Sequence, residues 1–138
     1  MDGMPPLLQV HDYFTWPDRF DLVNHWWNWH GMPGLFSETT LPKLAVIVTS
    51  DGAPVCFLAC DQSNSIGKAT LESAVTAPGL SAGEARRALQ FAEAAIFSVI
   101  RPHYGLAQTF TSPAIARTLE RDGWTRIGET VHLIKQIT

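Results

Sequence analysis

The spacing of apolar residues predicts a β-rich middle section. Residues 43–49 and 53–60 are two runs rich in β-branched and apolar residues, joined by a turn that contains Asp51-Gly52. Asp-Gly between such runs is one of the strongest short-range hairpin signals. A polar stretch over residues 61–67 leads into a third run, residues 69–75. The pattern predicts a three-stranded antiparallel meander.

After the third run the apolar period changes to that of a helix, over residues 82–100. Ser81 and Glu84 form the pattern Ser-x-x-Glu of a capping box, which places the helix start at Ser81. Arg101-Pro102 ends the helix. The apolar positions at helical spacing are Ala85, Ala88, Leu89, Ala92, Ala95, Ile96 and Val99.

The residues after the long helix predict a strand, a helix and a second strand. The strand lies at about residues 104–110, the helix begins at Thr111-Ser112-Pro113, and Gly123 closes it at the first position after the C-cap. Residues 130–137 alternate enough for a last strand. Residues 1–138 are therefore expected to form one mixed α/β domain, a meander followed by helix, strand, helix and strand, with the sheet and the C-terminal helices in residues 41–138.

Residues 1–40 form a different, aromatic region. Met4-Pro5-Pro6 predicts an irregular lead-in, and a helix is predicted over residues 19–29. The apolar residues of this helix cover more than one face, so it is either buried on two sides or presents an aromatic surface to a ligand. Trp26 and Trp29 are the candidates for contact with an aromatic or flat substrate, and core packing is the alternative.

Composition narrows the possible functions. The net charge is −3 and the pI is about 5.9, which argues against electrostatic binding of nucleic acid as the main role. No apolar run approaches the ~20 residues that span a bilayer, and the start of the chain lacks a signal-peptide pattern, so we expect a cytoplasmic protein. Cys56 and Cys60 lie four strand residues apart, about 13 Å, and are expected to be reduced, packed thiols.

The segment between the third strand run and the long helix is the strongest candidate for a binding site. Pro78-Gly79-Leu80 leads from the strand into the helix start at Ser81. The first N–H groups of a helix have no partner within the helix and attract phosphate. A plain capped helix start is the alternative interpretation.

The order strand, glycine-bearing loop, helix, strand and helix resembles the GCN5-related N-acetyltransferase (GNAT) superfamily over roughly residues 44–137. The family's pyrophosphate signature, Arg/Gln-x-x-Gly-x-Gly/Ala, aligns with residues 80–85, so Gly83 and Ala85 stand at its small positions and Leu80 replaces the leading polar residue. The resemblance implies acetyl-CoA as cofactor. It also implies a set of cofactor-binding residues, Val75, Leu80, Gly83, Glu84, Ala85 and Arg86. Arg86 is alternatively a solvated surface residue.

The resemblance also implies catalytic residues. A carboxylate in the strand before the loop often deprotonates the acceptor amine, and Glu72 occupies such a position. Glu72 is alternatively on a solvated face opposite Leu71. The family's tyrosine acid, four residues before the glycine of the last helix, corresponds to Leu119, which cannot donate a proton. Tyr104 and His103, at the start of the preceding strand, are the alternative donors.

Two functions follow from this resemblance. The first is an acyl-CoA-dependent N-acyltransferase, which acetylates an amine of unknown identity. The second is a catalytically inactive GNAT-like interaction or structural protein, which Leu80 and Leu119 favour. Leu41-Pro42 and the tight loop over residues 78–85 are similar to short phage and prophage GNAT-like proteins, and such a source would place the protein in a host cytoplasm or a virion. A homodimer or a protein partner is compatible with both. No metal is expected, because the spacing of His25 and His30 does not align ligands on a helix.

Overall fold

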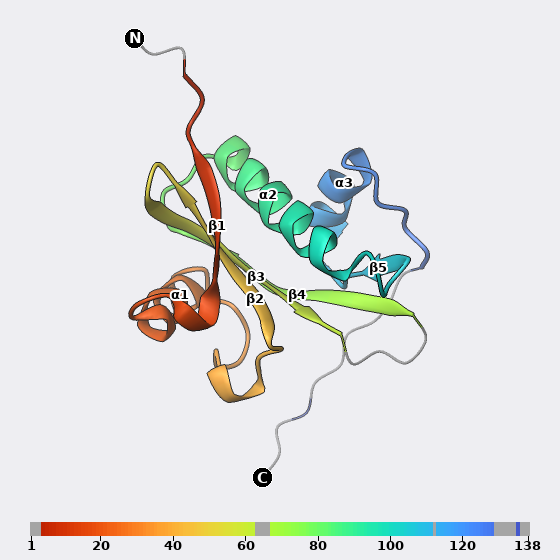
Figure 1. Cartoon of the computed structure of the whole chain (residues 1–138), viewed down its shortest axis with the longest axis horizontal. Coiled ribbons are helices and arrows are strands. Elements are labelled where there is room, and N and C mark those ends of the chain that lie inside the picture. Colours follow the sequence, from red (N-terminus) through yellow and green to blue (C-terminus); the bar gives the residue numbers. More distant parts are fainter. Residues whose placement is uncertain (1–3, 63–66, 112, 129–134, 136–138) are drawn as a thin grey trace.

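The computed structural model describes residues 4–62, 67–111, 113–128 and 135 (Figure 1). The predicted last strand, residues 130–137, lies outside the described residues except for Lys135. The elements in chain order are β1 (Leu8–Asp12), a 3-10 turn (Tyr13–Thr15), α1 (Arg19–Trp29), a second 3-10 turn (Glu38–Thr40), β2 (Leu44–Ser50), β3 (Ala53–Asp61), β4 (Lys68–Thr76), α2 (Ala82–Ile100), β5 (Leu106–Gln108) and α3 (Pro113–Arg121).

The strands form one mixed sheet in the order β1-β2-β3-β4-β5. The first four strands pair antiparallel, and β5 pairs parallel to β4. The predicted hairpin between β2 and β3 is confirmed. Asp51 and Gly52 have φ values of 49° and 86°, and positive φ at both central residues is the geometry of the tight turn that Asp-Gly favours. The predicted mixed α/β fold is therefore confirmed.

The first strand was not predicted. Met4-Pro5-Pro6 predicts an irregular lead-in before α1, but residues 8–12 pair with β2 and extend the meander to four strands. Within this strand, Leu8 packs against the apolar cluster between the sheet and α2, whereas Val10 is 40% exposed. Such a short, half-exposed edge strand leaves little apolar periodicity to recognise.

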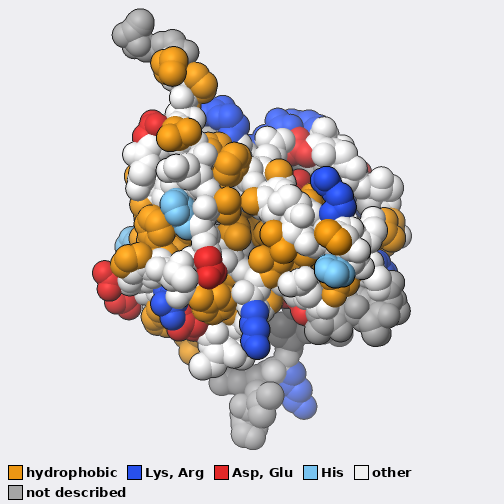
Figure 2. All heavy atoms as spheres, in the orientation of Figure 1, with side chains coloured by type: hydrophobic (Ala, Val, Ile, Leu, Met, Phe, Trp, Pro, Cys, Tyr) orange, Lys and Arg blue, Asp and Glu red, His pale blue; other side chains and the backbone are white. Residues whose placement is uncertain are grey.

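Two apolar clusters lie on opposite faces of the sheet, and α1 and α2 cover one face each (Figure 1). The α2-side cluster consists of Val46, Val48, Val55, Cys56, Leu58, Cys60, Ala69, Leu71, Ala88, Ala92, Ile96 and Ile100. The α1-side cluster consists of Tyr13, Val23, Trp26, Phe36, Ala45, Ile47, Phe57, Ala59 and Val75. Figure 2 shows hydrophobic side chains gathered where β1 and α2 approach each other. Because β2 and β3 are covered on both faces, their sequences read as continuous apolar runs.

The start of α2 and the end of α3 follow the predicted signals. Ser81 Oγ accepts a hydrogen bond from the Glu84 N–H at 3.1 Å, and Glu84 Oε1 accepts one from the Ser81 N–H at 2.9 Å, so the capping box is formed. Gly123 follows α3 with φ of 99°, and the Trp124 N–H donates to the Leu119 carbonyl at 3.0 Å. Both cysteines are free thiols and buried, as expected.

Candidate active site

Strands β4 and β5 separate soon after they pair, and this separation creates the site. Residues 68–70 pair with residues 106–108. Thr109 Oγ1 then donates to the Leu71 carbonyl at 3.1 Å and closes the junction. Beyond Leu71, no strand in the described part of the chain pairs with β4 on this side. The second half of β4 therefore presents backbone groups to an open space, where an extended ligand can pair with them.

A β-bulge in β4 turns Glu72 and Val75 to the same face of the sheet. Ala59 is opposite Glu72 and Phe57 is opposite Val75, so two residues of β4 face one residue of β3. Ser73, inside the bulge, has φ of 58°. Ala59, Phe57 and Val75 all belong to the α1-side cluster. Since directly opposed residues of paired strands share a face, the Glu72 side chain lies on the α1 face.

The open space is a cleft of about 480 Å³ that reaches both faces of the sheet. From the α1 face it is lined by Trp27, His30 and Met32, and from the α2 face by Leu89, Glu93 and Trp124. Between them lie β4 residues 71–76 with Leu58, and the other lining residues are Thr109, Phe110, Thr111, Ile115 and Leu119. These described lining residues are mostly apolar, and neither Lys nor Arg is among them. Apolar clefts with a few placed polar groups are typical of small-molecule sites.

Glu72 places a carboxylate in the lining of this cleft. Burial raises its pKa, and the nearby charge of Asp61 raises it further. The sequence left open whether Glu72 points into a cleft or lies on a solvated face. Glu72 and Leu71 do lie on different faces of the sheet, but α1 packs on the face of Glu72. A half-buried carboxylate with a raised pKa is a stronger proton acceptor than one in water.

The end of α1 forms the wall of the cleft on the α1 face of the sheet. His30 Nε2 lies 2.7 Å from the Thr76 carbonyl oxygen, and Trp27 Nε1 donates to the Gly34 carbonyl at 3.2 Å. Of the two tryptophans predicted to contact substrate, Trp26 is 3% exposed and belongs to the core, so it cannot reach a ligand. Trp29 is 59% exposed, packs its ring against His30 and does not line the cleft. The tryptophan at the cleft is Trp27, which the sequence analysis did not select.

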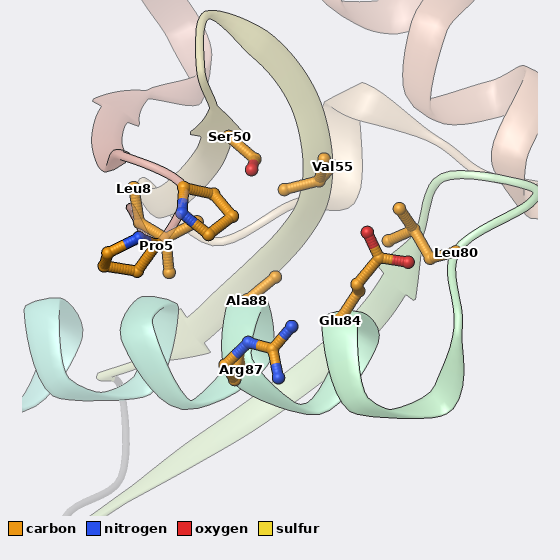
Figure 3. A pocket seen from close by; sticks show the side chains of 9 residues that line it. Pro5, Leu8, Ser50, Val55, Leu80, Glu84, Arg87 and Ala88 are labelled. Atoms are coloured by element: carbon orange, nitrogen blue, oxygen red, sulfur yellow. The ribbon is translucent and has the colours of Figure 1, made fainter. Parts of the chain in front are cut away.

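The predicted cofactor-binding residues divide among several places. Val75 lines the cleft. Leu80 and Glu84 line a separate hollow of about 190 Å³, between the start of α2, the N-terminal segment and the β2–β3 hairpin (Figure 3). The hydrogen bonds from Ser81 lower the pKa of Glu84, so this carboxylate stays charged and accepts from the Ser81 N–H. Glu84 is therefore a helix cap rather than a phosphate ligand.

Gly83 and Ala85 lie in the first turn of α2. Gly83 is exposed, and a Cβ at this position would meet only the flexible guanidinium of Arg87, at 3.5 Å. The capping box engages the N–H groups of Ser81 and Glu84, so the N–H groups of Ala82 and Gly83 remain as first-turn donors for an anion. Figure 2 shows Lys and Arg side chains at the end of the molecule where α2 begins.

Arg86 is engaged in an ion pair. Its Nη2 donates to Asp122 Oδ1, and its Nε lies 3.3 Å from Asp122 Oδ2. The pair lowers the pKa of Asp122 and connects the start of α2 to the end of α3. The positive charge that the sequence assigned to cofactor binding is thus largely compensated within the protein.

Tyr104 lies away from the cleft. Its hydroxyl donates to the Gln62 carbonyl, and its ring packs against the α2-side cluster. Tyr104 is not among the residues that line the cleft, so the structure does not bring it to Glu72.

Glu93, which was not predicted as a site residue, lines the cleft from α2. Its position, four residues after Leu89 and beside the apolar stripe of the helix, is the signal that identifies it in retrospect. The described residues contain no group of three or more His, Cys, Asp or Glu side chains that would hold a metal ion. None of the helices in the described residues has the length and apolar character needed to cross a membrane.

Comparison with solved structures identifies the fold. An acyl-CoA N-acyltransferase from Pseudomonas aeruginosa superposes with a TM-score of 0.62 at 12% sequence identity, covering 90% of this chain and 91% of that one. The fold is that of the GNAT acetyltransferases. The aminoglycoside N-acetyltransferase AAC(6')-Iy in complex with CoA matches with a TM-score of 0.58 at 13% identity, over 99% of this chain and 100% of the other.

A third GNAT-fold structure, N-acetylglutamate synthase from Neisseria gonorrhoeae complexed with CoA and N-acetyl-glutamate, has a TM-score of 0.60 at 13% identity. It covers 83% of this chain, which corresponds to 28% of that larger protein. No protein-family model and no curated protein sequence matches the chain. The similarity to phage and prophage proteins stays a prediction.

Proposed function

We propose that this protein is an acyl-CoA-dependent N-acyltransferase that acetylates an amine. The observation that supports this function best is the position of Glu72, a half-buried carboxylate in the cleft where β4 separates from β5. Solved GNAT-fold structures that share this architecture bind CoA. In the proposed reaction Glu72 accepts a proton from the amine as the amine attacks the thioester carbonyl.

The open side of β4 suits the pantetheine arm of the cofactor. This arm is extended and carries amide groups, which can pair with the backbone of residues 72–76 as an added strand would. The N–H groups of Ala82 and Gly83 are then available to the pyrophosphate. Acetyl-CoA would enter from the α2 side, and the amine would approach Glu72 from the α1 side, past Trp27 and His30.

A catalytically inactive interaction protein is the second candidate, favoured by Leu119. This side chain lines the cleft at the position that the family resemblance assigns to a tyrosine acid, and it cannot donate a proton. Native mass spectrometry of the protein purified from cell extract separates the two. Co-purified CoA supports the enzyme, whereas a stoichiometric protein partner supports the binding protein.

Calorimetric titration with acetyl-CoA tests the proposed cofactor directly. Desulfo-CoA and ATP are the controls for the acyl group and for the nucleotide. We expect micromolar binding of acetyl-CoA that ATP does not reproduce. Turnover is then followed by release of the CoA thiol with a panel of primary amines, namely spermidine, tryptamine, kanamycin and a peptide with a free N-terminus. Absence of binding at millimolar acetyl-CoA contradicts the proposal.

A further inference from the structure

The described residues that line the cleft include two carboxyl groups, which come from opposite faces of the sheet. Glu72 lies on the α1 face, because it is opposite Ala59 of the α1-side cluster. Glu93 belongs to α2, whose buried residues pack on the other face. Figure 1 shows the two helices on opposite sides of the sheet. The two carboxyl groups therefore reach the cleft from opposite sides of the sheet.

The Glu93 carboxyl group is held in a fixed orientation. Trp124 Nε1 donates to Glu93 Oε1 at 2.8 Å, and the Trp124 ring lies 6.3 Å from the ring of Phe97, one turn further along α2. The side chain is half-buried, between α2 and the segment that follows α3. A carboxyl group that is oriented by an indole N–H and partly withdrawn from water can exchange a proton with a ligand at a defined position.

We propose that Glu93 is the general acid of acyl transfer, which protonates the sulfur of the departing CoA. This inference rests on the acyltransferase function proposed above. The amine nitrogen forms a bond to the thioester carbonyl carbon and gives a proton to Glu72. The carbon–sulfur bond then breaks, its electron pair goes to sulfur, and the Glu93 carboxyl proton is transferred to that sulfur. After products leave, Glu72 loses its proton to solvent and Glu93 regains one.

The other residues of the cleft do not fit this role as well. Among the described residues that line the cleft, the titratable side chains are His30, Glu72 and Glu93. The His30 ring is held by the Thr76 carbonyl on the α1 face, the side from which the amine would approach. Glu93 lies on the α2 face, where the helix start that accepts the pyrophosphate also lies. Burial and the charge of Asp122 raise the pKa of Glu93, and the hydrogen bond from Trp124 lowers it. The net shift is upward, and a raised pKa favours the protonated form that an acid requires.

Leaving-group dependence tests the role of Glu93. Glu93→Gln keeps an acceptor for the Trp124 N–H and removes the acidic proton. The two donors are acetyl-CoA, whose alkyl thiolate needs protonation, and S-(4-nitrophenyl) thioacetate, whose thiolate is a much weaker base. The acceptor is the panel amine with the highest turnover. We expect kcat/KM of the variant to fall on the order of 100-fold or more with acetyl-CoA and less than about threefold with the nitrophenyl ester.

Two further variants keep the interpretation unambiguous. Glu120→Gln removes a carboxylate from the outer surface of α3, where it pairs with Arg126, and should leave both donors unaffected. Leu119→Tyr in the Glu93→Gln background introduces a phenol into the same cleft and should restore part of the acetyl-CoA rate.

Equal losses with both donors would show that Glu93 has only a structural role, and an undiminished acetyl-CoA rate would show that it is not used. Either result overturns the inference while the acyltransferase function stands. If the wild-type protein transfers acetyl groups to none of the amines, the proposed function fails, and the inference fails with it.

Discussion

The imidazole Nε2 of His30 lies 2.7 Å from the carbonyl oxygen of Thr76, so the end of α1 is joined to the end of β4. A carbonyl oxygen only accepts hydrogen bonds, so Nε2 carries the proton. Both residues line the cleft, and the bond fixes the distance between its α1 wall and its β4 floor. The geometry of the site thus depends on a contact between residues that are 46 positions apart.

Removal of this bond should loosen the cleft wall more than it destabilises the fold. We expect His30→Ala to lower the free energy of unfolding by about 1 kcal/mol, as for a typical single hydrogen bond. The KM for the amine should rise because the wall is no longer fixed. Urea unfolding and steady-state kinetics measure the two effects. An unchanged KM in a variant that has lost stability would show that the bond does not shape the site.

The neighbouring residues Trp26 and Trp27 allow the core and the cleft to be tested with the same substitution, because Trp26 is buried in the core and Trp27 lines the cleft. Trp26→Ala should lower the free energy of unfolding by about 3–5 kcal/mol, because the ring fills the α1-side cluster. Trp27→Ala should cost clearly less and should alter the KM for the amine. Chemical denaturation monitored by circular dichroism gives the comparison. Equal losses of stability for the two variants would contradict the assignment of Trp27 to the cleft.

Substitutions at Gly83 separate the fold from cofactor binding. The open space around this residue admits a side chain, and a carboxylate at a helix start interacts favourably with the helix dipole. Gly83→Glu should therefore fold normally but lose detectable acetyl-CoA binding, since its charge repels the pyrophosphate. Gly83→Gln has nearly the same size without the charge and should bind more weakly than wild type but measurably. Calorimetry on both variants is the measurement; normal binding to Gly83→Glu places the phosphates elsewhere.

The pH dependence of turnover should report the raised pKa of Glu72. A general base acts when it is deprotonated, so the rate rises as pH passes through its pKa, and this limb should lie above the ordinary range near 4.5. Asp61→Asn removes a charge that raises this pKa and should shift the limb to lower pH. Glu72→Gln should lower kcat by about 100-fold or more. A limb that does not move in Asp61→Asn would argue against Glu72 as the base.

The two buried thiols should make the protein less stable at alkaline pH. Burial raises the pKa of Cys56 to about 12 and of Cys60 to about 11, from 9.0. Below pH 9 the thiols are protonated in both states, whereas above it the unfolded chain ionises first. The free energy of unfolding should then fall by up to about 1.4 kcal/mol per pH unit per thiol. Urea unfolding from pH 8 to 11 measures the slope, which Cys56→Ala should reduce.

Local signals were sufficient for most of the secondary structure. The Asp51-Gly52 turn, the Ser81 and Glu84 capping box and the glycine after α3 each depend on residues a few positions apart, so the sequence alone predicts them. The long-helix prediction was less accurate at Val99, which is 55% exposed. Helical periodicity gives an apolar stripe but does not say which of its edges the sheet covers.

The candidate site was only partly predictable. Glu72 and Val75 were identified from the strand that precedes the loop, and both line the cleft. The prediction of Trp26 instead of Trp27 was wrong, because a helix covered on more than one side leaves no polar face to orient it. The pairing of Arg86 with Asp122 joins residues 36 positions apart, and Trp124 with Glu93 joins residues 31 apart. Such contacts leave no local pattern in the sequence.

The sequence by itself determined the order of most elements, the α/β class and the burial of the thiols, because these depend on short-range periodicity, turns and caps. Only the tertiary structure decided where the cleft lies. The bulge at Ser73 places Glu72 and Val75 on the same face of the sheet, although they are three residues apart. The separation of β5 from β4 after Thr70 opens the space beside Glu72. Both depend on the pairing of distant strands, which is set by packing over the whole sheet.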